Sequence, residues 1–240
     1  MARLRPFLRA VSLKRGQVLR EPGRATEYVY FPHGGVITLM VLMVDGRAVE
    51  TAMISREGVV GAMAGLGLDL PLARAVVQVA SIATRVAAED FRRVVQASDQ
   101  LRDLLVRYQE VLLGQVQITA ACNALHPIEA RLARWILQTR DRVTDERIPL
   151  TQEQLSRMLG VRRGTVSAIA ARFQAAGIIS YTRGALTIND RAKLEATACE
   201  CYQLTNQRIG LMLPRSAVGQ RSGGGRGQTG APSPARACSP

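Results

Sequence analysis

The residues whose types and spacing could do chemistry gather between positions 151 and 188. Two arginines open a predicted helix over 162–176, where a guanidinium can donate paired hydrogen bonds to guanine O6 and N7. The other outward residues of this helix are small or polar, which allows a close approach to a duplex. The pattern therefore predicts base reading in a major groove. The predicted DNA-binding residues are Thr151, Arg162, Arg163, Gly164, Thr165, Ser167, Ala168 and Arg183.

Local signals around this helix predict a helix-turn-helix followed by a wing. Thr151 and Gln154 have the spacing of a capping box, and Gly160 can supply the left-handed turn that ends the first helix. A glycine turn between two helices is the arrangement whose second helix enters the major groove. A short hairpin follows, with Arg183 at its tip, where a basic side chain would meet phosphate. We expect Arg183→Ala to weaken binding evenly on all DNA sequences.

The charge balance favours a polyanionic partner. The formal net charge is +13, and residues 126–193 hold 12 Lys or Arg against six Asp or Glu. The alternative is a ligand-binding or protein-interaction module without specific DNA binding, in which the hairpin of helices contacts protein. An enzyme is not predicted, because the chain has two histidines and no pairing of a nucleophile with a base.

The segment over 13–88 that must position these residues is predicted to be rich in β-strands. Turn signals recur about every ten residues, and apolar runs lie between them at 28–31, 36–44, 48–54 and 76–86. The pair Asp45-Gly46 between two such runs predicts a tight hairpin. Short strands at this spacing favour a small barrel, roll or sandwich.

A long helix is predicted over 98–125, with apolar residues at alternating spacings of three and four. A monomer could bury this seam against its own roll, but its length and narrowness favour a dimer. A second stripe, at Leu105, Leu112 and Val116, would then pack on the roll. The predicted dimer-interface residues are Leu101, Leu104, Tyr108, Val111, Ile118, Cys122 and Leu125, with Gln115 as the polar exception.

The predicted organisation has four segments, divided where composition or periodicity changes. His126-Pro127 breaks the long helix, and a new helix over 127–142 follows, in which Trp135 is interpreted as a core residue. The tail is rich in Gly, Pro and Ser, contains arginines and is expected to be disordered. The segments are a sensory roll over 10–97, the long helix over 98–126, a DNA-binding domain over 127–206 and the tail over 207–240.

The four cysteines show no metal-ligand or disulfide pattern. Cys122, Cys199, Cys201 and Cys238 contain no C-x-x-C pair, so they are interpreted as free thiols and no metal site is predicted. Cys199 and Cys201 could be redox-active, but alternate residues on one helix point apart. The N-terminus has no secretory signal, and no apolar run reaches the ~20 residues of a membrane span. A cytoplasmic protein without membrane contact is expected.

The order of these segments resembles that of the Crp/Fnr family of bacterial transcription regulators. The resemblance is strongest in the segments HPIEARLARW at 126–135 and LTQEQLSRMLGVRR at 150–163, and it covers about residues 10–205 in all. It implies an α+β fold with an N-terminal cyclic-nucleotide-binding-type β-roll, a long dimerisation helix and a C-terminal winged helix-turn-helix. It also implies a homodimer that binds double-stranded DNA at a two-fold symmetric site and contacts RNA polymerase.

The recognition helix departs from the pattern of the cyclic-AMP-responsive members. In those members, the resemblance implies an Arg and, one residue on, a Glu that read bases. Arg163 matches the Arg, whereas Gly164 stands at the Glu, and Ala168 stands at a further base-reading Arg. We therefore expect a different DNA target.

The ligand cassette departs from the family further. The resemblance places it at Gly61-Ala62 and Arg74-Ala75, so the ribose-binding Glu and the phosphate-binding Ser or Thr are missing. Gly61 and Arg74 are the candidate ligand-binding residues, and no response to cyclic AMP is expected. An iron–sulfur cluster is not expected either, because no cysteine precedes Cys122. His33 stands in a turn, so a haem ligand is not predicted, and no cofactor is assigned.

Overall fold

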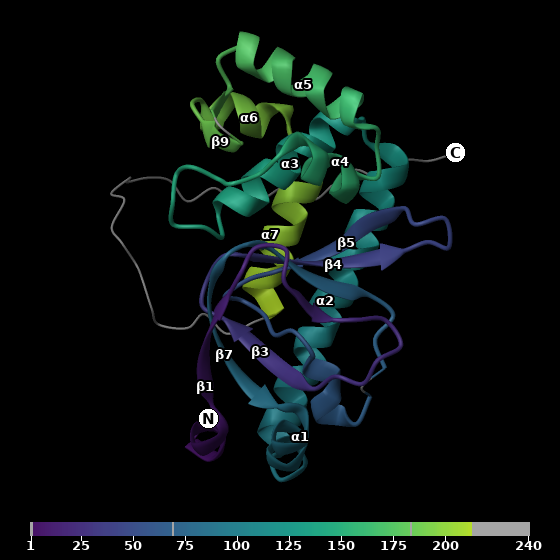
Figure 1. Ribbon diagram of the computed structural model, residues 1–240, viewed down its shortest axis with the longest axis vertical. Coiled ribbons are helices and arrows are strands. Elements are labelled where there is room, and N and C mark those ends of the chain that lie inside the picture. The colour runs from purple at the N-terminus through teal and green to yellow at the C-terminus, as the bar shows by residue number, and fades with distance from the viewer. Residues whose placement is uncertain (1, 69, 183, 213–240) are drawn as a thin grey trace, which may run out of the picture.

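The computed structural model describes residues 2–68, 70–182 and 184–212, and Figure 1 shows its arrangement. An antiparallel β-roll at the lower end carries the long helix α2 (Asp99–Leu125), which rises beside it to a helical part at the upper end. The N-terminus and helix α1 (Ala88–Gln96) lie at the end of the molecule opposite helix α5 (Arg163–Ala175).

The roll contains two antiparallel sheets. One has the strand order β1 (Arg9–Leu13), β7 (Ser81–Ala87) and β3 (Tyr28–Pro32). The other has the order β2 (Val18–Arg20), β6 (Arg74–Val79), β4 (Val36–Leu42) and β5 (Ala48–Ile54). The predicted apolar run over 76–86 is two strands rather than one, because the chain passes from one sheet to the other at Ala80.

The hairpin that joins β4 to β5 turns at the predicted Asp45-Gly46 pair. Gly46 has φ +81°, and the N–H of Met43 donates to the carbonyl of Arg47 at 2.8 Å. Positive φ costs glycine little, because it has no Cβ. The turn fixes the register in which Leu42 faces Ala48.

Helices close the roll. The short helices η1 (Ala2–Phe7) and η2 (Ala62–Leu66) lie against α1, and Phe91, Leu105 and Tyr108 share one apolar cluster with them. The hydroxyl of Ser98 accepts a hydrogen bond from the N–H of Leu101 and so caps α2. The helix ends at Leu125, before the predicted His126-Pro127 break.

The predicted seam of α2 is partly buried within the chain. Helix α7 (Cys201–Met212) lies along α2 and covers the face that was assigned to a partner. Val111 and Cys122 are buried on this side, whereas Tyr108 is buried against the roll, where its hydroxyl donates to the carbonyl of Val59 at 3.0 Å. The chain itself therefore covers these three residues, which corrects their prediction as dimer contacts. Of the other predicted seam residues, the structure leaves Leu104 and Leu125 exposed and half-buries Leu101 and Ile118. The second stripe, at Leu105, Leu112 and Val116, packs on the roll as predicted.

The C-terminal part surrounds one apolar core that includes Trp135, Leu155, Phe173 and Leu186. Helix α7 extends to Met212, so residues 207–212 are helical and do not begin the predicted tail, while residues 213–240 lie outside the described residues. Its elements are α3 (Ile128–Arg140), α4 (Gln152–Leu159), α5, β8 (Ile179–Thr182), β9 (Ala185–Ile188), α6 (Arg191–Thr197) and α7.

The two parts of the chain pack directly on each other. Val36, Met53 and Val79 of the roll belong to the same apolar cluster as the C-terminal core. The buried guanidinium of Arg142 pairs with Glu57 at 2.7 Å. Within the described residues, every helix is too short or too polar to cross a membrane.

Candidate nucleic-acid interface

The first helix of the pair, α4, begins at the predicted capping box. The N–H of Gln154 donates to the hydroxyl of Thr151 at 3.2 Å, and the N–H of Thr151 donates back to Oε1 of Gln154 at 3.0 Å. Gly160 ends the helix with φ +67°, the left-handed conformation that the tight turn requires. Both ends of α4 are thus fixed by local hydrogen bonds and backbone conformation.

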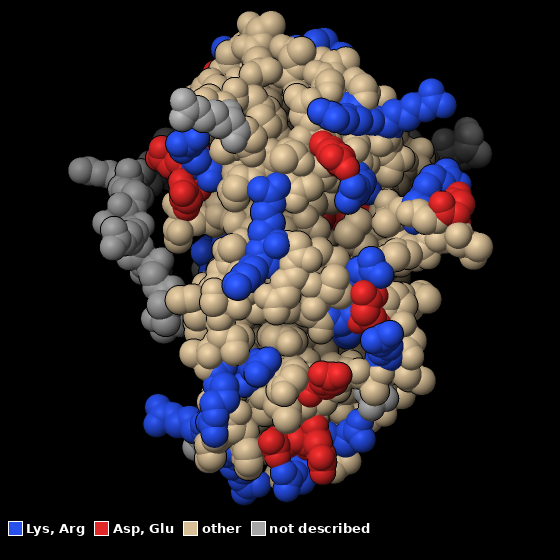
Figure 2. Space-filling view, in the orientation of Figure 1, with Lys and Arg blue, Asp and Glu red and all other residues tan. Residues whose placement is uncertain are grey.

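Helix α5 is held by an apolar face and presents a small outer face. Val166, Ile169 and Phe173 are buried. Gly164 and Ala168 are exposed on the opposite side. In Figure 2, the upper end of the molecule, where α5 lies, is largely uncharged, with Lys and Arg side chains beside it. The surface could therefore lie close to a duplex, with basic groups at its margins.

Two arginines stand at the start of this helix, and the described part of the chain offers neither of them a side-chain partner. Arg162 is the N-cap residue, one position before the helix, and its side chain makes no capping bond. Arg162 and Arg163 are exposed, and among the described residues neither forms an ion pair or a side-chain hydrogen bond. By contrast, Arg157 pairs with Glu153 and Arg172 pairs with Glu129. The two N-terminal guanidinium groups are free to bind an external acceptor.

Three of the predicted DNA-contact residues make contacts within the chain or are half-buried. The hydroxyl of Ser167 donates to Oε1 of Gln152 at 2.6 Å, which ties α5 to the start of α4. Thr151 caps α4, and Thr165 is half-buried. Ser167 and Thr151 thus help to hold α5 and α4 in place, which is a role within the fold besides the predicted one of DNA contact.

The predicted wing is the hairpin of β8 and β9, in which Thr182 faces Ala185. Arg183 at its tip lies outside the described residues. The hydroxyl of Tyr181 donates to the carbonyl of Leu150 at 3.0 Å and so joins the wing to the approach of α4. Burial raises the pKa of Tyr181 to about 12, so this hydroxyl keeps its proton at neutral pH.

The candidate ligand residues of the roll are not arranged like free anion-binding groups. Gly61 has φ +86° before η2, and the neighbouring Ala62 is buried in an apolar cluster. Nε of Arg74, in β6, donates to a carboxylate oxygen of Glu21 at 2.8 Å. An anionic ligand at Arg74 would therefore have to compete with an existing carboxylate.

Sequence reasoning missed two groups of residues that the fold brings together. Glu50 of β5 is buried and accepts a hydrogen bond from Trp135 of α3. Cys122, His126, Cys199 and Cys201 form a cluster, although no metal site was predicted from their spacing. The available signals were a Cys-x-x-x-His at the end of α2 and a Cys-x-Cys after α6. A hydrogen bond between the sulfurs lowers the pKa of Cys122 to about 5 and raises that of Cys199.

Comparison with known proteins gives matches in both parts of the chain. Residues 10–98 match the cyclic nucleotide-binding domain, and residues 130–197 match the Crp-like helix-turn-helix domain. A search among curated proteins gives no match. The second match contains α4, α5 and the wing, so the helix pair described above coincides with a known DNA-binding domain type.

Solved structures of low sequence identity share the architecture. FixK2 from Bradyrhizobium japonicum is 16% identical, with a TM-score of 0.66 over 80% of this chain and 98% of that chain. A Crp/Fnr-family transcriptional regulator from Thermus thermophilus is 19% identical, with a TM-score of 0.65 over 79% and 98%. The c-di-GMP responsive global regulator CLP of Xanthomonas campestris is 14% identical, with a TM-score of 0.62 over 78% and 96%. These likenesses confirm the predicted fold class.

Proposed function

The chain belongs to the Crp/Fnr family and is a DNA-binding transcription regulator, and from this premise we propose how it binds. It acts as a homodimer whose two α5 helices enter successive major grooves of a two-fold symmetric site. Arg163 is the principal base-reading residue, and Arg162 and the wing contact the phosphate backbone. Bound beside a promoter in the cytoplasm, the dimer contacts RNA polymerase, as the family resemblance implies.

The observation that carries this proposal is the pair of unpaired guanidinium groups at the N-terminus of α5. Arg162 and Arg163 are exposed at the first turn of a helix whose orientation is fixed by the capping box and the Gly160 turn. N-terminal residues of a recognition helix are those that reach base edges. An arginine can also bind guanine through two hydrogen bonds, which is worth about 1–3 kcal/mol of discrimination.

The outward face of α2 supports a dimer, although it is not the face that the sequence indicated. Val106 and Leu113 are 59% and 51% exposed, and Ala120 follows on the same face, seven residues further along. Residues spaced by seven form one stripe on a helix. Two such stripes packed together would place two DNA-binding domains about a two-fold axis.

Contacts between the roll and α4 support a modulating role for the roll. Arg15, in the turn after β1, donates to Gln154 of the capping box. Val49 of β5 lies beside Gly160, at the turn between α4 and α5. A change in the roll could therefore alter the orientation of the recognition helix. Cyclic AMP is not the proposed signal, because Ala62 offers no carboxylate and Arg74 is paired with Glu21.

Selection of bound duplexes from a random DNA pool, followed by footprinting, tests the proposal. The expected result is a site with two half-sites about 10–11 base pairs apart and affinity that falls steeply with salt. The same selection with cyclic AMP should give an unchanged site and affinity. Absence of protection at low salt would overturn the proposal.

A matched pair of variants tests the assigned role of Arg163. Arg163→Ala should relax base preference at one position of each half-site, at a cost of about 1–3 kcal/mol on the selected sequence. Arg93→Ala removes the same charge from α1, at the far end of the molecule, and should leave binding unchanged. An equal loss of affinity on all sequences from Arg163→Ala would show that it contacts phosphate instead.

A further inference from the structure

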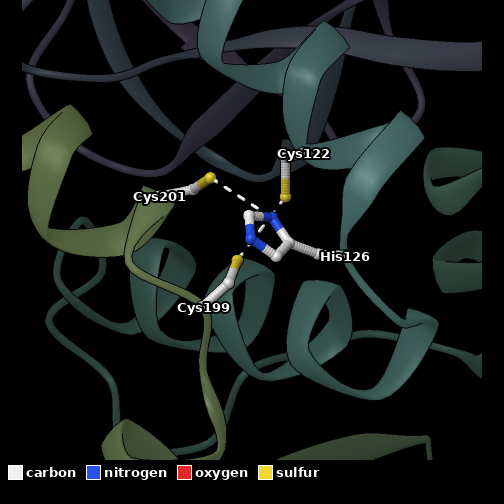
Figure 3. Close-up of side chains that lie close together, drawn as sticks. All are labelled: Cys122, His126, Cys199 and Cys201. Carbon is white, nitrogen blue, oxygen red and sulfur yellow. Dashed lines mark hydrogen bonds between the residues drawn. The ribbon is translucent and has the colours of Figure 1, made fainter. Parts of the chain in front are cut away.

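Four potential metal ligands converge where the long helix meets the C-terminal part (Figure 3). Cys122 lies in the last turn of α2, and His126 is the C-cap of the same helix, four residues on. Cys199 lies between α6 and α7, and Cys201 is the first residue of α7. Because the chain turns between α6 and α7, the two sulfurs reach one centre, which corrects the assumption that they lie on a single helix and point apart.

The distances within this Cys/His cluster fit one tetrahedral metal ion. The three Sγ atoms and one imidazole nitrogen all lie within 4.8 Å of one another. Sγ of Cys122 lies 3.5 Å from Sγ of Cys199, and Sγ of Cys201 lies 3.6 Å from Nδ1 of His126. Zinc bonds of about 2.3 Å to sulfur and about 2.1 Å to nitrogen give tetrahedral edges of roughly 3.5–3.8 Å. These two separations correspond to opposite edges of such a tetrahedron.

The surroundings of the cluster have the features of a closed structural metal site. All three cysteines are buried, and Nε2 of His126 lies 3.1 Å from a carboxylate oxygen of Glu200. A carboxylate bound to the outer nitrogen orients a ligating histidine and leaves Nδ1 to face the metal. Among the described residues, no other set of three or more Cys, His, Asp or Glu side chains is gathered in this way.

Two buried arginines lie where they would offset the negative charge of such a site. Three thiolates and a neutral imidazole around Zn²⁺ have a net charge of −1. Arg131 and Arg134 of α3 are buried, and both interact electrostatically with the cysteine cluster. The Nε atoms of both arginines have no hydrogen-bond partner among the described residues. A buried anionic centre nearby accounts for their retention in the core.

Three other interpretations explain less of this geometry. A disulfide between Cys122 and Cys199 would leave Cys201 and His126 without a role. A polynuclear iron–sulfur cluster attaches its ligands to different metal ions, which would hold the ligand atoms farther apart than they are here. Hydrogen-bonded thiols alone would be weak partners, because S–H is a poor donor.

We propose that Cys122, His126, Cys199 and Cys201 bind a single Zn²⁺ ion that fastens the start of α7 to the end of α2. The ion would close a loop of the chain that contains the whole helix-turn-helix, since Cys122 and Cys199 flank it in sequence. Arg131, beside the cluster, also donates to the carbonyl of Leu159, at the end of α4, at 2.7 Å. The ion would therefore stabilise the packing of α4 against α3 as well as helix α7 itself.

Metal analysis of the full-length protein, purified in reducing buffer without added metal chelator, tests the proposal. About one zinc per chain is expected in the wild type. Cys199→Ser should lose most of the zinc, whereas Cys238→Ser, which changes the cysteine that lies outside the described residues, should keep it. Wild-type protein with no stoichiometric zinc that also fails to bind added Zn²⁺ would overturn the proposal, as would co-purified iron and sulfide.

A measurement on the wild type alone keeps the proposal testable if the variants do not fold. Replacement of the metal by Co²⁺ should give the visible absorption of a tetrahedral site and a thiolate charge-transfer band. A thiol reagent should modify one cysteine in the metal-loaded protein and all four after the metal is removed by a chelator. Octahedral cobalt spectra, or equal thiol reactivity with and without the chelator, would count against a Cys₃His site.

Discussion

The indole N–H of Trp135 donates a hydrogen bond of 2.9 Å to a carboxylate oxygen of Glu50. It joins α3 of the DNA-binding part to β5 of the roll. Burial raises the pKa of Glu50 to about 7. The hydrogen bond from Trp135 and the nearby Arg134 and Arg142 act in the other direction and lower this pKa, but by less. The contact between the roll and the DNA-binding part therefore contains a carboxyl group whose pKa lies near neutral pH.

The first prediction concerns the pH dependence of stability. Because the folded-state pKa of Glu50 lies above its ordinary value of 4.5, folding favours the protonated form. The stability that this preference gives is fully present below about pH 4.5. As the pH rises through about 7, the free energy of unfolding falls by up to about 3 kcal/mol. Glu50→Gln keeps an oxygen acceptor for Trp135, so it should match the wild type at pH 5 and exceed its free energy of unfolding at pH 8.

Denaturant unfolding across pH 5 to 8 measures this difference. Glu89→Gln, which removes a carboxylate at an exposed position of α1, is the control and should follow the wild type. A wild-type stability that changes with pH in parallel with Glu50→Gln would contradict the assignment.

The second prediction concerns Gly164, where the outer surface of α5 has room for a side chain. A Cβ placed there meets no atom within 4 Å. Gly164→Glu should shift base preference, because a carboxylate can accept from the cytosine N4 amino group. Gly164→Ala is its control and should raise the free energy of unfolding by up to about 0.8 kcal/mol, from helix propensity, with the preference unchanged. Selection from a random pool that returned the same site for Gly164→Glu would place this residue away from the bases.

The third prediction concerns the proposed dimer face of α2. Leu113→Arg places a charge in the stripe of Val106, Leu113 and Ala120, so the protein should become monomeric in sedimentation analysis. Affinity for the two-half-site operator should fall roughly 100-fold, because the half-sites would no longer be bound together. Ile82→Arg, at a position of β7 that is 59% exposed, should leave the dimer intact. A monomeric wild type at micromolar concentration would contradict the proposed face.

The fourth prediction concerns the close approach of α7 to α2. A Cβ at Gly114 would overlap Nε of Arg208, whose guanidinium pairs with Glu110 at 2.6 Å. We expect Gly114→Ala to lower the free energy of unfolding by about 1 kcal/mol, since Arg208 must move. In an Arg208→Ala background, the same change should instead stabilise by up to about 1 kcal/mol, because alanine favours the helix. A double-mutant cycle of unfolding free energies measures the coupling, and additive effects would contradict it.

Some features followed from the sequence because near neighbours determine them. The capping box of Thr151 and Gln154 and the left-handed glycines at Gly46 and Gly160 each depend on only a few adjacent residues. Hydrophobic periodicity likewise predicted α2 and the inward face of α5. These local signals were sufficient for the fold class and for the position of the helix-turn-helix.

Other features depended on which distant segments meet. Periodicity showed that Tyr108, Val111 and Cys122 share a face of α2, but it could not show that the roll and α7 cover that face. Cys122 and Cys199 are 77 positions apart, and Glu50 and Trp135 are 85 apart, so no spacing rule could pair them. Sequence patterns report contacts within a turn or a hairpin, because those are set by backbone geometry. The Cys/His cluster and the interdomain carboxylate arose only from packing of the whole chain, in which burial and side-chain chemistry select the partners.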